Sequence, residues 1–453
     1  MTPNAIAAIP AAALLAVAAS SAKAAREAAH ARPPNIVFIL ADDLGYGDLG
    51  CYGQHNIKTP SLDLLARGGM RFTQCYAGST VCAPSRCCLM TGLHTGHAFV
   101  RGNARVPLRL GENSVARMLQ MRGYRTALIG KWGLGEPGTT GIPNRQGFDF
   151  FYGYLNQAVA HNSFPDSLWR NETAEPIPAN ADGRRGAYSN DLFTREAVGF
   201  VEANKADPFF LYLAYTAPHA NSTARTMEAP RVEPEYRDKP WPEAEKLFAS
   251  TITRMDRDIG DLIKRIDALG LRGDTVVFFA SDNGPHREGG HDPAFFFSAG
   301  PLRGIKRDLY EGGIRVPAIV RWPGKVRAGT VCDVPWAFWD FLPTVADIAQ
   351  AKAPGNLDGV SVLPVLLGRT PAVRPPMYWE FHEGGFSQAA RMGDWKAVKR
   401  SPRSPVELYA LNNDAAETAD IASRHPEVVR RMERFLRDAR TDSAEFPVTA
   451  PGR

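Results

Sequence analysis

Two acidic pairs stand directly after apolar runs of this sequence. Asp42 and Asp43 follow the run NIVFIL and one alanine. Asp282 and Asn283 follow the run TVVFFA and one serine. Carboxylate and amide oxygens are hard ligands that suit Ca²⁺ or Mg²⁺ better than Zn²⁺. Asp and Asn also begin ordinary turns after strands, so either pair alone is ambiguous, but the two together raise the possibility of a divalent-cation site.

The apolar runs have the pattern of short strands buried on both faces of a sheet. A third run, PFFLYLA, occupies residues 208–214, and helix-like segments lie at 61–67, 114–122 and 249–269. Buried strands that alternate with helices predict a doubly wound α/β sheet. Ligand sites in such sheets form outside the carboxyl ends of the strands, where both acidic pairs stand.

After about residue 374 the pattern changes to short strand-like segments separated by turns. These segments lie at 377–381, 387–391, 395–398 and 406–409, and a helix follows at about 426–440. The pattern predicts a small antiparallel sheet with one helix. We therefore expect a catalytic domain at 33–373 and a C-terminal subdomain at 374–453.

Residues 1–24 resemble a secretory signal peptide. The apolar stretch 5–19 is too short for a membrane span, and Ala22-Lys23-Ala24 is a cleavage pattern of small residues, although no Lys or Arg precedes the stretch. We expect cleavage after Ala24 and export to the periplasm or the medium. No other stretch approaches the ~20 apolar residues of a membrane helix, so none is expected after cleavage.

The charge balance and the cysteines exclude some classes of function. There are 53 Lys and Arg against 48 Asp and Glu, and no block of like charges, so nothing indicates nucleic-acid binding. The six cysteines have neither C-x-x-C nor Cys/His spacing, so a structural zinc is not expected. An exported protein could oxidise some of them, but the sequence does not choose a pairing.

The segment 81–92 reads VCAPSRCCLMTG. It resembles the signature of the type I sulfatases, C-x-P-S-R followed by L-x-T-G, and every fixed position is filled. In that family the cysteine is oxidised by a maturation enzyme to formylglycine, whose hydrate is a gem-diol, and Cys82 matches that position. A lone cysteine is usually a small buried hydrophobe, but a full match beside two acidic strand ends makes that reading weaker.

Further motifs extend the resemblance over most of residues 33–440, in the family order. They are G-K-W at 130–132, P-H at 218–219, D-N-G at 282–284, K-x-x-x-Y-E-G-G at 306–313 and E-L-Y at 407–409. The resemblance implies an alkaline phosphatase-like α/β fold, with a large mixed central sheet flanked by helices and a small C-terminal antiparallel sheet plus helix. It also implies that the protein is an enzyme, a sulfuric ester hydrolase.

The resemblance implies a metal site that agrees with the acidic pairs. The ligands would be Asp42, Asp43, Asp282, Asn283 and an oxygen of the modified Cys82. The ion would be Ca²⁺ by resemblance, with Mg²⁺ also possible.

The resemblance also implies the catalytic roles. Arg86 would fix and activate the formylglycine diol, because a developing oxyanion needs a fixed cation beside it. Lys131 and Lys306 would bind sulfate oxygens, and His219 would donate a proton to the leaving alcohol. The second hydroxyl of the diol then allows sulfate to leave with return of the aldehyde, which a serine could not do.

One position departs from the family. Gly133 stands where the family motif G-K-W-H-L-G has a histidine, which in relatives helps to deprotonate the diol as sulfate is expelled. The base for that step is therefore open, and His161, His286 and His291 are candidates from other loops. Gln157 is a candidate for a sulfate contact. Inactivity does not follow, because the nucleophile, the metal ligands and both lysines are present.

Three readings of the function remain. The leading one is hydrolysis of sulfate monoesters, with a sulfated small molecule or, more specifically, a sulfated carbohydrate as substrate. A phosphate or phosphonate ester hydrolase of the same superfamily is one alternative, and a non-catalytic protein that binds sulfated glycans is another. His94, His97, Arg287 and the phenylalanines 295–297 could either contact substrate or pack in the core.

Overall fold

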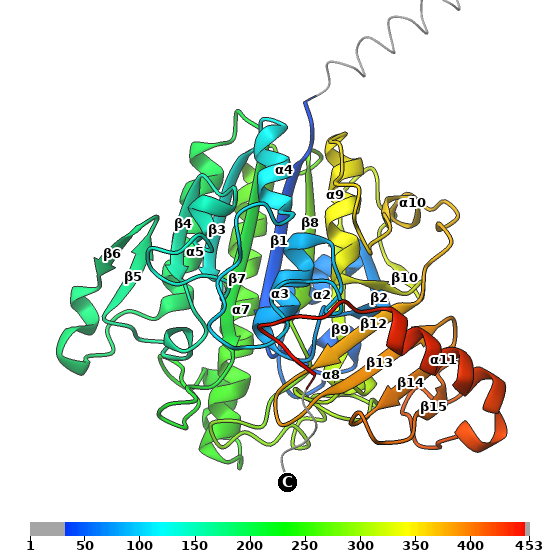
Figure 1. The fold of residues 1–453 in the computed structure, drawn as a ribbon. Coiled ribbons are helices and arrows are strands. Elements are labelled where there is room, and N and C mark those ends of the chain that lie inside the picture. The colour runs from blue at the N-terminus through cyan, green and yellow to red at the C-terminus, as the bar shows by residue number, and fades with distance from the viewer. Residues whose placement is uncertain (1–31, 449–453) are drawn as a thin grey trace, which may run out of the picture. The chain divides into compact units, whose positions relative to one another are not determined.

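The computed structural model describes residues 32–448, so the expected signal peptide lies outside the described residues. The larger of its two sheets has eleven strands in the order β10-β2-β9-β8-β1-β7-β3-β4-β5-β6, with β11 paired to β2 (Figure 1). The strands are β1 (Asn35–Asp42), β2 (Met70–Tyr76), β3 (Arg125–Lys131), β4 (Phe150–Tyr154), β5 (Ser167–Arg170), β6 (Thr173–Pro176), β7 (Phe209–Pro218), β8 (Thr275–Ser281), β9 (Arg315–Arg321), β10 (Thr330–Cys332) and β11 (Trp336–Ala337).

The centre of this sheet is parallel and has antiparallel pairs on both sides, and at one edge β10 and β11 run parallel to β2. β1 lies between β7 and β8 and runs parallel to both, and β3 and β4 continue the parallel part. β9 is antiparallel to β8 and β2, and β5 is antiparallel to β4 and β6. The three apolar runs of the sequence are therefore neighbouring strands, and the expected large mixed sheet is confirmed.

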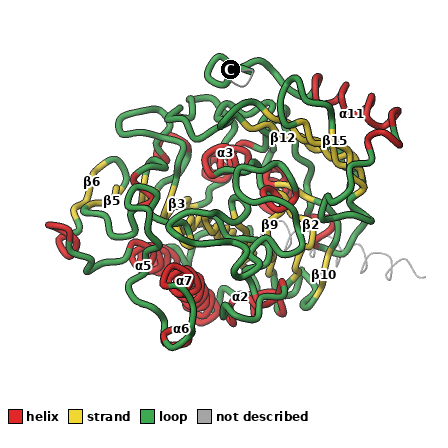
Figure 2. The backbone as a smooth tube through the Cα atoms, turned by 90° about the horizontal axis from the view of Figure 1, so that it is seen from below, coloured by secondary structure: helices red, strands yellow, loops and turns green. Residues whose placement is uncertain are grey.

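Helices cover both faces of the sheet (Figure 2). They are α2 (Pro60–Arg67), α3 (Cys82–Thr91), α4 (Val115–Met121), α5 (Ser189–Ala203), α6 (Pro234–Arg237), α7 (Glu243–Ala268), α8 (Glu311–Ile314), α9 (Phe341–Ala349), α10 (Leu363–Leu366) and α11 (Pro426–Asp438). Alternate residues of β1 face opposite layers, because strand side chains alternate. Phe38 and Leu40 pack in the core with α3, α4 and α9, whereas Val37 and Ile39 pack in the core with α2, α5 and α7.

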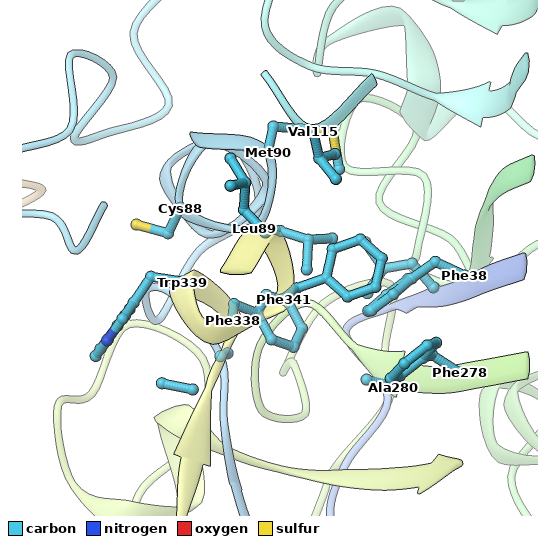
Figure 3. Close-up of a cluster of buried hydrophobic side chains, with 14 of the residues drawn as sticks. Phe38, Cys88, Leu89, Met90, Val115, Phe278, Ala280, Phe338, Trp339 and Phe341 are labelled. Carbon is cyan, nitrogen blue, oxygen red and sulfur yellow. The ribbon is translucent and has the colours of Figure 1, made fainter. Parts of the chain in front are cut away.

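Aromatic side chains of the central strands support α3 (Figure 3). The ring of Phe38 stacks on Phe278 of β8 at 6.1 Å and meets Phe341 of α9 edge-on at 4.7 Å. Leu89 and Met90 of α3 belong to the same buried cluster. Burial of each large apolar side chain contributes about 1.5–3 kcal/mol to stability, so this cluster stabilises the position of α3.

The smaller sheet is antiparallel and has four strands in chain order. They are β12 (Met377–Phe381), β13 (Ser387–Met392), β14 (Trp395–Lys399) and β15 (Glu407–Ala410). Val428, Met432 and Leu436 of α11 pack on this sheet beside Tyr378. The predicted C-terminal sheet and helix are confirmed.

Two further expectations concern membranes and disulfides. Among residues 32–448 no helix is long and apolar enough to cross a membrane. All six cysteines are free thiols: Cys82, Cys87 and Cys88 belong to α3, and Cys51, Cys75 and Cys332 lie elsewhere. Within the described residues, the structure therefore has no disulfide bond.

Candidate active site

The two acidic pairs meet at the carboxyl ends of β1 and β8. The strands are paired with Ala41 opposite Ser281, so the residues that follow are brought side by side. The backbone N–H of Asp43 donates to Asp282 Oδ1 at 3.1 Å, and Asn283 Nδ2 donates to Asp43 Oδ1 at 2.7 Å. These side chains, with that of Asp42, are fully buried. Asp43 has a left-handed backbone with φ of 67°, a strained conformation that is common at functional sites.

This cluster has the properties of a cation site. Burial, and then the Asp42 carboxylate, raise the pKa of Asp282 to about 7, because three carboxylates are crowded away from water. Asn283 Oδ1 is buried and has no hydrogen-bond partner among residues 32–448. A hard divalent cation would relieve the repulsion and would use the unpartnered oxygen, so the donor set fits Ca²⁺ or Mg²⁺.

Helix α3 places Cys82 and Arg86 against this cluster. The helix begins at Cys82, and Gly92 ends it with a left-handed φ of 71°, which glycine adopts without strain. Arg86 lies one turn after Cys82 and therefore on the same face. Arg86 Nη2 lies 2.7 Å from Asp282 Oδ2 and 3.5 Å from Asp42 Oδ1. Cys82 Sγ lies 3.4 Å from Asp42 Oδ1.

The environment of Cys82 disfavours thiolate chemistry. Burial, and then the Asp42 carboxylate, raise the pKa of the Cys82 thiol well above its usual value. The thiolate is the nucleophilic form of cysteine, so an unmodified Cys82 is a weak nucleophile here.

Two buried lysines face the acidic pair of β1. Lys131 ends β3, and its Nζ donates to Asp42 Oδ2 at 2.6 Å. Lys306 Nζ donates to Asp43 Oδ2 at 2.7 Å. Burial alone would lower the pKa of both lysines, but the paired aspartates outweigh burial and raise it, so both are charged. Together with Arg86 they place three cations among three carboxylates, and an added divalent cation would make the pocket attractive to an anion.

His219 follows the last residue of β7 and lies beside Lys306. Its Nδ1 lies 2.6 Å from the carbonyl oxygen of Ala220, which fixes the tautomer, and its Nε2 accepts from Lys306 Nζ at 3.0 Å. Burial, and then the Lys306 ammonium, hold the pKa of His219 well below its usual value. The shared proton of this pair therefore rests on Lys306.

A cavity of about 220 Å³ lies beside these residues. Six residues named by the sequence contribute to its wall: Cys82, Gly133, Gln157, His161, His219 and Lys306. Arg86, Lys131 and the acidic cluster lie directly behind it, through the contacts to Asp42 described above. The structure thus brings together every residue expected to act as a catalytic or metal-binding group.

Charged residues of the cavity wall were missed by the sequence analysis. They are Arg105, Glu136, Glu288 and Arg307. Glu288 accepts from Ser222 Oγ at 2.6 Å and from Arg307 Nη1 at 3.0 Å. Lys306 outweighs burial and lowers the pKa of Glu288 to about 2, so this carboxylate is charged. Glu288 follows the D-N-G motif by four residues, which was an available signal, but Arg105 and Glu136 come from loops with no distinctive pattern.

Other residues of open function lie elsewhere. The backbone N–H of His94 and the ring of His97 both bond to Asp358. Arg287 is paired with Asp292 at 3.5 Å on the surface. Phe296 is buried in the core, whereas Phe295 and Phe297 are exposed. None of these lines the cavity, as far as residues 32–448 define it.

The mixed sheet defines an alkaline phosphatase-like α/β fold, and a buried acidic cluster at its centre lies behind a cavity lined by charged residues. The family model of the sulfatases matches residues 34–351, and the model described as N-sulphoglucosamine sulphohydrolase, C-terminal, matches residues 305–442. The chain therefore belongs to the sulfatase family and is a sulfuric ester hydrolase.

Individual relatives agree with this assignment. The chain is 33% identical to human (Homo sapiens) arylsulfatase A, over 91% of this chain and 89% of that protein. It is 28% identical to the N-acetylgalactosamine-6-O-sulfatase of Bacteroides thetaiotaomicron, over 91% and 94%. The crystal structure of Ps i-CgsB in complex with k-i-k-neocarrahexaose is similar with a TM-score of 0.78 and 30% identity, over 90% of this chain and 92% of that one.

Proposed function

We propose that this chain hydrolyses sulfate esters of carbohydrates, with a formylglycine made from Cys82 and one divalent cation, Ca²⁺ in preference to Mg²⁺. The observation that best supports this proposal is the position of Cys82. It begins α3 with its Sγ 3.4 Å from a buried aspartate, in the wall of a cavity that it shares with Lys306 and His219. Such an environment suppresses the thiolate and suits an oxygen nucleophile.

The cation and the formylglycine would occupy adjacent places. Asp42, Asp43, Asp282 and Asn283 would hold the cation together with an oxygen of the modified residue 82. The cation would supply Lewis acidity toward a sulfate oxygen and toward the nucleophilic hydroxyl. The formylglycine would supply a hydrated aldehyde, whose two hydroxyls permit attack and later release of sulfate.

Arg86 orients the nucleophile in this proposal. Its Nε and Nη2 both donate to Asp282 Oδ2, at 3.0 and 2.7 Å, and its Nη1 donates to the carbonyl oxygen of Lys131. This guanidinium cannot rotate without losing three buried hydrogen bonds. It therefore holds a fixed positive charge one helical turn from residue 82, where negative charge develops during attack.

The lysines and His219 act on the sulfate and the leaving group. Lys131 and Lys306 would each offer an N–H to sulfate oxygens and oppose the charge that develops during transfer. His219 and Lys306 share one proton across 3.0 Å, and we assign this pair to protonation of the leaving alcohol.

A carbohydrate substrate agrees with the wall of the cavity. Glu288, Glu136, Arg105 and Arg307 surround it with charged hydrogen-bonding groups that can bind sugar hydroxyls. Among the relatives, one is named for action on N-acetylgalactosamine 6-sulfate, and one structure contains a neocarrahexaose. The partners in this proposal are thus a sulfated glycan and a formylglycine-generating enzyme, and the protein would be exported to the periplasm or secreted.

The test is turnover by protein produced with a sulfatase-maturing enzyme. Sulfated monosaccharides and oligosaccharides, an aryl sulfate, an aryl phosphate and an aryl phosphonate would be assayed with Ca²⁺ or Mg²⁺. We expect sulfate release from a sugar sulfate and its loss in Cys82→Ala. Turnover of the phosphate or phosphonate alone would favour the phosphoester reading. Binding of sulfated glycans without turnover by fully matured protein would favour the binding reading.

A further inference from the structure

The structure explains why position 133 has no side chain. Gly133 has a left-handed φ of 85°, and a Cβ built on it would lie 2.0 Å from Gln157 Nε2. That distance is far inside van der Waals contact. In this chain the side chain of Gln157 therefore occupies the space beside Gly133. An imidazole that does the work of the family histidine must then come from another residue.

Gln157 itself is free to bind a ligand. Both atoms of its terminal amide are buried, and neither has a hydrogen-bond partner among residues 32–448. An unpartnered buried amide is destabilising, and a ligand in the cavity would supply the missing hydrogen bonds. An amide can donate to a sulfate oxygen, but it does not accept a proton at neutral pH, so it does not replace the basic function of an imidazole.

His286 is not available as a base. Its Nδ1 accepts from the backbone N–H of Glu288 at 3.0 Å, and its Nε2 lies 3.2 Å from the carbonyl oxygen of Pro218. The ring is fully buried. Both nitrogens are engaged with the backbone, so this ring can neither reach nor exchange a proton with a ligand.

His291 is excluded by its position. Its Nδ1 lies 2.7 Å from Glu245 Oε2, and its ring stacks on Phe248 at 3.6 Å. Its Nε2 is buried and has no hydrogen-bond partner among residues 32–448. The wall of the cavity, as residues 32–448 form it, does not include His291.

His161 has the position that the other two histidines lack. It ends a short 3₁₀ helix (Val159–His161) four residues after Gln157, and both residues line the same cavity as Cys82. Its ring stacks on that of His219 with 4.1 Å between centroids and 14° between planes. No hydrogen bond to either of its ring nitrogens is found within residues 32–448, so they are free to accept a proton.

We propose that His161 is the base for sulfate release, in place of the histidine missing at position 133. This inference rests on the proposed formylglycine chemistry. The proton of the free hydroxyl on residue 82 passes to a ring nitrogen of His161, and the electron pair of that O–H bond becomes the second carbon–oxygen bond of the aldehyde. The carbon–oxygen bond to sulfate breaks, and its electron pair leaves with the sulfate. Nothing is oxidised or reduced.

The charges around His161 agree with a base that is neutral before the step. Burial, and then the Lys131 ammonium, lower the pKa of His161 to about 4. Lys306 acts in the same direction, whereas Asp42 and Asp43 oppose it. The ring therefore enters the reaction with its nitrogen lone pair available.

The test compares His161→Gln with wild-type protein, both matured to formylglycine, on an aryl sulfate. His55→Gln is the matched control, because His55 is an exposed histidine outside the cavity. Rapid mixing would measure the initial burst of aryl alcohol. Acid quenching followed by intact-mass measurement would detect sulfate retained on the protein, about 80 Da above the hydrated aldehyde. His161→Ala would be measured as a second variant, and thermal unfolding would verify that each variant is folded.

We expect both His161 variants to show a burst of about one alcohol per enzyme, retained sulfate, and kcat at least about tenfold lower than wild type. His55→Gln should behave as wild type. Turnover by the His161 variants within threefold of wild type would overturn the inference. Loss of turnover without burst or retained sulfate would also overturn it, because it would place His161 in the first step. If matured wild-type protein itself did not turn over, the proposed function would fail instead.

Discussion

Replacing Lys396 by methionine should destabilise the protein by about 3 kcal/mol. It should also loosen the segment that carries the active-site residue Lys306. Lys396 Nζ donates to Glu311 Oε1 at 2.9 Å and to Glu417 Oε1 at 3.0 Å, and all three side chains are fully buried. Glu311 begins α8, five residues after Lys306. The cluster thus joins β14 of the small sheet to the segment that presents Lys306.

The magnitude follows from what remains after the ammonium is removed. Breaking a buried ion pair costs about 3–5 kcal/mol, because a charge is left uncompensated. Glu311 keeps the hydroxyl of Tyr76 at 2.6 Å and Arg315 at 3.3 Å. Among residues 32–448, the carboxylate of Glu417 keeps only the backbone N–H of Glu311, at 2.6 Å. Burial already raises the pKa of Glu417 to about 7, so it can take up a proton, and this places the cost at the low end of the range.

Urea unfolding of wild type, Lys396→Met and the double variant Lys396→Met/Glu417→Gln would measure these free energies. The double variant removes the uncompensated carboxylate, so it should recover about half of the loss or more. A single variant within about 0.5 kcal/mol of wild type would refute the reasoning. A double variant less stable than the single one would also refute it.

Three further predictions concern separate residues. Lys306→Met should lower kcat on a sulfate ester about 10²–10³-fold in steady-state assays, because it removes a buried cation from the site; a change below threefold would contradict its role. Gly133→Ala should lower the melting temperature and raise KM, because its Cβ would displace Gln157 at a strained φ; unchanged values would refute this account. Asp258→Asn should change how stability depends on pH. Burial, and then Asp191, raise the pKa of Asp258 to about 7, above the unfolded value of about 3.9, so the wild-type native state binds the extra proton and loses stability as pH rises between those values. The asparagine variant should lack this loss, which urea unfolding should show as about 4 kcal/mol at about pH 8 and almost none at about pH 4; equal pH dependence in both proteins would refute it.

The sequence predicted those parts of the site that follow from strand ends and from one helix. Asp42 and Asp282 come directly after apolar runs, and parallel neighbours in one sheet bring such positions together. Cys82 and Arg86 are one helical turn apart, so their common face was implied once the segment was assigned to a helix. These relations are local or depend on a single strand pairing.

The rest of the site depends on contacts between loops that no local pattern encodes. Three histidines were equal candidates in the sequence, and only their hydrogen bonds and burial separate His161 from His286 and His291. Arg105 and Glu136 reach the cavity from loops that are surface-like in composition. The outer strands β5, β6 and β10 are only three or four residues long, which is too short for an alternation of apolar residues to stand out.

The measurement that tests the account most directly is the mass of the tryptic peptide 72–86, which contains Cys82, from protein produced with a sulfatase-maturing enzyme. The account predicts a mass about 18 Da below that of the thiol peptide, as conversion of the cysteine to an aldehyde requires. Turnover of a sugar sulfate should be found only in samples that show this shift. A thiol at Cys82 in protein that hydrolyses sulfate esters at full rate would contradict the account.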